Sequence, residues 1–87
     1  MSTYLGYSYA WAMEHQDEKA FLNSVAKRLA DLRREKGLTQ ERLADTAGVD
    51  RVAIANIETG LRRPTVTTMY RLAKALGIKV EELFNNL

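Results

Sequence analysis

The 87-residue sequence contains no cysteine, one histidine and one proline. Without cysteine there is no disulfide and no thiolate to bind zinc or act as a nucleophile. The single histidine, His15, excludes a metal site or proton relay that needs two histidines. A chain this short has a thin core, because it buries only roughly 60% of the surface that its unfolded form exposes. The sequence therefore predicts one small, well-packed helical domain with no metal and no cofactor.

Long apolar runs are absent as well. No stretch approaches the roughly 18–20 apolar residues of a membrane span, and no basic segment precedes a hydrophobic one as in a secretion signal. There is no glycine-rich phosphate loop, and the adjacent carboxylates of Glu81 and Glu82 would point about 100° apart on a helix. We predict a cytoplasmic protein that does not bind a membrane and is not an enzyme.

The net charge of +2 conceals an uneven distribution. Residues 1–20 carry Lys19 against three acidic residues, a balance of −2, which leaves +4 on residues 21–87. Four of the seven aromatic residues also lie near the N-terminus, namely Tyr4, Tyr7, Tyr9 and Trp11. We therefore divide the chain into an acidic, aromatic extension over residues 1–20 and a basic domain over residues 21–87. A basic domain favours an anionic partner.

Apolar residues recur with helical spacing from Asp17 onward. The first stripe consists of Leu22, Val25, Leu29 and Leu32. Further predicted core residues are Leu43, Ile54, Ile57, Met69, Leu72 and Leu76. No convincing strand pattern is present, so the sequence predicts an all-α bundle.

Turn residues divide this pattern into five helices. Residues of the N-cap type precede the second, third and fourth helices at Thr39, Asp50 and Thr65. Glycines end the same helices at Gly48, Gly60 and Gly77. A short last helix holds Val80, Leu83 and Phe84, and we expect it to fray at its start because Lys79 is a poor cap. Arg28, Arg34 and Arg71 are expected to be solvated.

The segment 37–60, GLTQERLADTAGVDRVAIANIETG, resembles the helix-turn-helix of the Cro/repressor (XRE-type) family. The RRP segment at 62–64 and the LAKALGIKVEELF segment at 72–84 resemble the family's later helices, so the resemblance covers about residues 21–84. The opening Val49-Asp50-Arg51 also resembles the controller proteins of restriction–modification systems. The resemblance implies a five-helix, lambda-repressor-like DNA-binding domain that regulates transcription, here with an N-terminal aromatic extension.

The second helix of the motif, at about residues 50–58, is the predicted recognition helix. It must enter a major groove about 12 Å wide, with Ile54 and Ile57 anchoring it on the core. The residues then left facing outward are Arg51, Val52, Ala55 and Asn56. Arginine can bond guanine or a phosphate, asparagine can pair with adenine or reach the backbone, and small apolar groups can touch thymine methyls. Ala53 and Ala55 replace more common polar residues, so we expect few direct base contacts, supplemented by DNA shape.

Contacts to the DNA backbone are predicted at both ends of the motif. Gln40 follows Thr39 at the start of a helix, where free amide groups favour a phosphate, and the resemblance implies that this glutamine contacts DNA. Arg62 and Arg63 are predicted to grip phosphates. The resemblance also implies a largely buried ion pair between Arg33 and Glu58.

We expect the protein to form a homodimer on double-stranded DNA. The predicted interface is the last helix, where the apolar residues are Val80, Leu83, Phe84 and Leu87. Two copies would place their recognition helices ~34 Å apart on a palindromic operator. Residues 1–20 are too apolar for a typical disordered tail, so we expect them to pack across a second copy or to bind another protein, whereas their charge of −2 disfavours an arm laid along DNA. The alternative function is an antitoxin, or another protein-interaction module, whose main partner is a protein such as a toxin.

Overall fold

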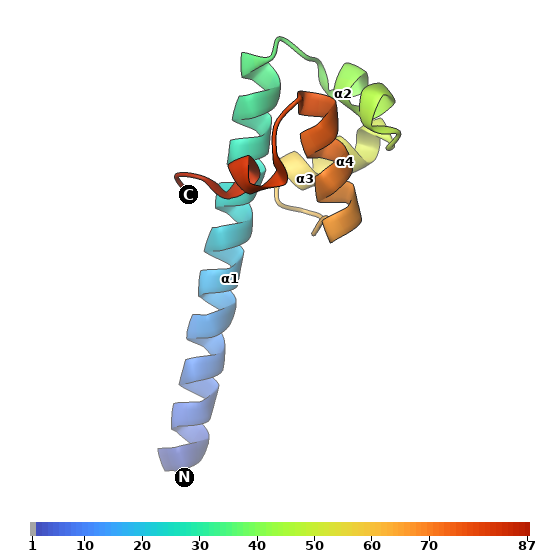
Figure 1. Ribbon diagram of the computed structural model, residues 1–87. Coiled ribbons are helices and arrows are strands. Elements are labelled where there is room, and N and C mark those ends of the chain that lie inside the picture. The colour runs from blue at the N-terminus through green and yellow to red at the C-terminus, as the bar shows by residue number, and fades with distance from the viewer. Residues whose placement is uncertain (1) are drawn as a thin grey trace.

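The computed structural model describes the backbone of residues 2–87 and the side chains from Gln16 onward. It consists of α1 (Ser2–Glu35), α2 (Gln40–Ala47), α3 (Arg51–Glu58), α4 (Val66–Leu76) and the 3-10 helix η1 (Val80–Phe84), with no strand among these residues. The four later elements gather beside the C-terminal half of α1, and its N-terminal half continues beyond them (Figure 1). The predicted all-α fold class is confirmed, although the fifth helix is a short 3-10 helix.

The helix ends follow from local chemistry. The Thr39 hydroxyl accepts a hydrogen bond from the Arg42 amide at 3.0 Å, and the Thr65 hydroxyl accepts one from the Thr68 amide at 3.1 Å. Gly48 ends α2 in the left-handed region with φ 70°, where glycine is unstrained. These predicted caps are confirmed. Asp50 holds the N-cap position of α3, but its side chain makes no capping hydrogen bond.

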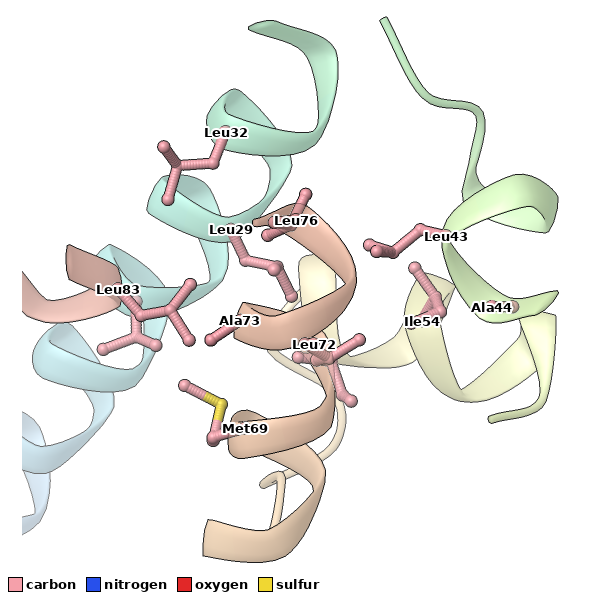
Figure 2. Close-up of a cluster of buried hydrophobic side chains, with 12 residues drawn as sticks. Leu29, Leu32, Leu43, Ala44, Ile54, Met69, Leu72, Ala73, Leu76 and Leu83 are labelled. Atoms are coloured by element: carbon pink, nitrogen blue, oxygen red, sulfur yellow. The ribbon is translucent and has the colours of Figure 1, made fainter. Parts of the chain in front are cut away.

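The core joins α1, α4 and η1 on one side to α2 and α3 on the other (Figure 2). Its largest fully buried side chains are Leu29, Leu43, Ile54, Leu72 and Leu83. Of the core residues predicted from spacing, all are buried except Leu22, which is half-buried. Burying each large apolar side chain contributes about 1.5–3 kcal/mol, so this cluster is the main source of stability in so small a domain.

The prediction that Leu83 belongs to a dimer interface is wrong. Leu83 is 0% exposed and lies between α1 and α4, near Ala73 (Figure 2). Residues three apart lie above one another in a 3-10 helix, so Val80 and Leu83 share the side that packs on the core. Phe84 falls on another side and remains 41% exposed.

Two further contacts hold η1 in place. Arg28, which we expected to be solvated, donates from Nε to the Glu82 carbonyl oxygen at 3.0 Å. The Glu82 carboxylate in turn accepts a hydrogen bond from the Lys79 backbone amide at 2.8 Å. The Lys79 side chain makes no capping hydrogen bond, but the Glu82 carboxylate binds the backbone amide at the start of η1.

The N-terminal extension and the first helix of the domain form one continuous helix. The predicted boundary at residue 20 falls within α1, whose bounds are Ser2–Glu35. At this boundary the ring of Phe21 stacks on that of Phe84, with centroids 6.3 Å apart and planes 4° apart. The predictions for the four aromatic residues near the N-terminus and for His15 lie outside the described side chains. No helix in the described part of the chain is both long and apolar enough to span a membrane.

Candidate nucleic-acid interface

A buried carboxylate fixes the last residue of α3 to α1. Arg33 donates to Glu58 through two nitrogens, from Nε to Oε2 at 2.6 Å and from Nη2 to Oε1 at 3.1 Å. Its third nitrogen, Nη1, donates to the Leu38 carbonyl at 2.7 Å. The two charged side chains are only 10% and 4% exposed. The ion pair that the resemblance implies is therefore present, and its planar, two-pronged geometry orients α3 against α1.

Gln40 joins the same carboxylate from α2. Its side-chain Nε2 donates to Glu58 Oε1 at 3.1 Å, so one oxygen accepts hydrogen bonds from two helices. This contact engages the amide nitrogen of the side chain that we predicted to contact DNA. The backbone amides of Gln40 and Glu41, in the first turn of α2, still have no acceptor within the helix and are suited to bind a phosphate.

The outer face of α3 lies at its N-terminal half. Arg51 is exposed and Val52 is 52% exposed, whereas Ala55 and Asn56 are half-buried. Ala53, which we noted as replacing a more common polar residue, is buried, so its lack of a polar group removes nothing from the surface. Residues two apart in a helix point about 200° apart, so Ala53 cannot share the side of Arg51 and Ala55. The missing polar group on the exposed surface therefore concerns Ala55 alone.

A sharp turn brings two arginines beside this face. The Asn56 carbonyl accepts hydrogen bonds from the amides of Leu61, at 2.9 Å, and Arg62, at 3.1 Å. Gly60 has φ +77°, a conformation that favours glycine, and a Cβ at this position would lie 2.6 Å from Oδ1 of the exposed Asn23 side chain, which would have to move aside. Arg62 and Arg63 are exposed beyond the turn and line a hollow of about 200 Å³ between the starts of α3 and α4.

The combined surface is basic at its exposed edge. Arg51, Arg62 and Arg63 are all exposed, and the acidic Asp50 lines the same hollow as Arg62 and Arg63. Asp31 belongs to α1 and is not part of this surface. A hydrogen bond from Lys27 lowers the pKa of its carboxyl group. No cluster of His, Cys, Asp or Glu suited to hold a metal occurs among the described residues.

This geometry, two short helices joined by a tight turn with the second presenting an open basic face, agrees with the comparison to known families. The HTH_3 helix-turn-helix model matches residues 29–83. The chain belongs to this family. The resemblance to the Cro/repressor (XRE-type) group is therefore confirmed, and the matched HTH_3 segment contains α2, α3, α4 and most of η1.

Three HTH_3-like proteins illustrate the similarity. An uncharacterized HTH-type transcriptional regulator, y4dJ of Sinorhizobium fredii, is 48% identical over 59 residues, covering 68% of this chain and 77% of its own. The restriction–modification controller protein C.AhdI from Aeromonas hydrophila superposes with a TM-score of 0.74 at 42% identity, over 75% of this chain and 98% of its own. The controller protein C.Esp1396I gives a TM-score of 0.69 at 33% identity, over 74% and 84%. The first of these relatives is named as a transcriptional regulator and the other two as controller proteins.

Sequence reasoning missed two contacts at this site. The bond from Gln40 to Glu58 joins residues 18 apart, and the close approach of Asn23 to Gly60 joins residues 37 apart. Neither has a local sequence signal. A glycine directly after a predicted helix, such as Gly60, does indicate a positive φ, but it does not identify Asn23 as the side chain that lies beside it.

Proposed function

We propose that this protein is a sequence-specific, DNA-binding transcriptional regulator that acts in the cytoplasm and binds a palindromic operator as a homodimer. The observation that carries the proposal is the outer face of α3, with Arg51 and Val52 exposed at its start and Glu58 anchored at its end. A helix that is anchored at one end and exposed at the other can enter a major groove while it stays packed on the core.

The proposed contacts divide into two kinds. Arg51, Val52, Ala55 and Asn56 face base edges or the nearest backbone. The start of α2, at Thr39 and Gln40, and the exposed Arg62 and Arg63 hold phosphates on either side. The Thr39 hydroxyl already caps α2, so its part is to orient the free amides that follow.

The first test is Arg51→Ala, measured by fluorescence anisotropy on an operator selected from random DNA and on unrelated DNA. If Arg51 reads a base, we expect operator binding to weaken by about 1–3 kcal/mol and discrimination against unrelated DNA to fall. Lys27→Ala is the matched control, because it removes one exposed positive charge from α1. Equal loss on both DNAs, with a shallower salt dependence, would reassign Arg51 to a phosphate.

The proposed dimer surface is Phe84 and Leu87, which are 41% and 46% exposed, whereas Val80 packs on the core beside Leu83 and lies outside it. Phe84→Ala is expected to weaken self-association and, with it, affinity for the full palindrome more than for a single half-site. The control is Tyr70→Ala, which removes an exposed aromatic ring from α4 instead. Sedimentation equilibrium measures the first effect, and an unchanged association constant in Phe84→Ala would rule out this surface.

The alternative function, a protein-interaction module such as an antitoxin, is favoured by one observation. The helix α1 continues beyond the domain that resembles other regulators. DNA binding that falls steeply with salt supports the regulator. Absence of any preference for selected DNA over random DNA would favour the protein-interaction module.

A further inference from the structure

Asp50 is an acidic side chain on a surface that otherwise attracts anions. It directly precedes Arg51 at the start of α3, and it lines the hollow of about 200 Å³ together with Arg62 and Arg63. All four side chains are exposed. A carboxylate at this place repels the phosphates that the three arginines attract. Asp50 therefore weakens binding to any DNA on which its charge gains no partner.

The fold does not use the Asp50 carboxylate. Its backbone has the extended conformation of an N-cap residue, with φ −74° and ψ 141°, but the side chain accepts no capping hydrogen bond. The caps of α2 and α4, Thr39 and Thr65, both accept one. None of the ion pairs found among the described residues involves Asp50. Only the weak, salt-screened attraction of its charge to the start of a helix remains as an internal role.

The chemistry of a carboxylate limits what Asp50 can bind on DNA. An ionised carboxylate accepts hydrogen bonds and cannot donate them, and phosphate oxygens are acceptors too. In the major groove the donors are the amino groups at N4 of cytosine and N6 of adenine. Adenine N6 lies beside the acceptor N7, which repels a carboxylate, so cytosine is the better partner.

The position of Asp50 suits such a contact. The first residues of a recognition helix are those that reach base edges in the major groove. We propose that the Asp50 carboxylate accepts a hydrogen bond from the N4 amino group of a cytosine in each half of the operator. This role rests on the proposed function, under which α3 enters the groove, and it adds a base contact of opposite polarity to that of Arg51.

The negative charge makes the contact selective. On the operator, the hydrogen bond from cytosine offsets the repulsion between the carboxylate and the phosphates. On other sequences the carboxylate meets acceptors such as thymine O4 or guanine O6, and the repulsion is not offset. Asp50 thus acts against the wrong DNA as well as for the right one, which is how specific interfaces commonly gain discrimination.

The test removes the charge without changing the fold. Wild type, Asp50→Asn and Asp50→Ala are each used to select fragments from random DNA, and circular dichroism checks that each variant is folded. Fluorescence anisotropy then compares the wild-type operator with a copy in which thymine replaces the selected cytosine in both halves. For wild type we expect each replaced base pair to weaken binding roughly 5- to 150-fold. In both variants we expect this preference for cytosine to be lost.

The matched control is Glu81→Gln, which removes an exposed carboxylate from η1 instead. It is expected to keep the preference for cytosine, whereas Asp50→Asn is expected to bind unrelated DNA more tightly than wild type does. The same preference in wild type and both Asp50 variants would overturn the cytosine contact and leave the regulator standing. A change by one common factor on all sequences would also overturn it, because Asp50 would then act only through its charge. Failure of wild type to select any sequence would overturn the regulator itself, and the role of Asp50 with it.

Discussion

Glu58→Ala is expected to lower the free energy of unfolding by about 3–5 kcal/mol, because it leaves the buried Arg33 guanidinium without its counter-ion. The Gln40 side-chain amide also loses its acceptor. Small domains have a total stability of about 5–15 kcal/mol, so the loss is a large fraction of the whole. Urea denaturation followed by circular dichroism measures it.

The matched control for this prediction replaces both charges. Breaking one partner of a buried ion pair is costly, whereas replacing both with apolar residues of similar size is often nearly neutral. The double variant Arg33→Met with Glu58→Leu is therefore expected to lie much closer to wild type than Glu58→Ala. Unchanged thermal stability in the single variant would show that the buried pair has no such role.

Leu83→Ala is expected to destabilise the isolated domain by about 2–5 kcal/mol, the usual cost when a fully buried leucine is truncated. The cavity would open between α1, α4 and η1, where Leu83 packs near Ala73 (Figure 2). Its exposed neighbour provides the control, because Phe84→Ala removes a larger side chain that is already 41% in solvent.

The two variants are expected to differ in kind. Leu83→Ala should lower the denaturation midpoint at every protein concentration, whereas Phe84→Ala should act mainly on concentration-dependent association. Thermal melts at two protein concentrations distinguish them. A Leu83→Ala protein as stable as wild type would mean that η1 contributes nothing to the core.

The features that sequence predicted well are those decided by neighbouring residues. Thr39 and Thr65 cap helices because their hydroxyls reach amides three residues later. Gly48 ends α2 because few other residues adopt its conformation without strain. The HTH_3 motif consists of such local signals, and the order of these caps and apolar residues along the chain is sufficient to predict the fold class.

Features decided by distant residues were not predictable from sequence. Leu83 and Phe84 are adjacent apolar residues, and only the packing of η1 on the core buries one and exposes the other. Arg28 resembles any surface arginine until η1 places the Glu82 carbonyl 3.0 Å from it. At the candidate site, only the hydrogen bond to Glu58, 18 residues later, shows that the Gln40 side-chain amide is already engaged.

The Glu58 carboxylate joins three helices at the end of α3, through Arg33 of α1 and Gln40 of α2. The helix α3 is thus fastened at its last residue, while Arg51 and Val52 at its start are exposed. Under the proposed function, attachment and base contact lie at opposite ends of one eight-residue helix. The exposed positions 51 and 52 can therefore be exchanged for those of another regulator without touching the Glu58 anchor, which makes this domain suitable for grafting a new operator preference.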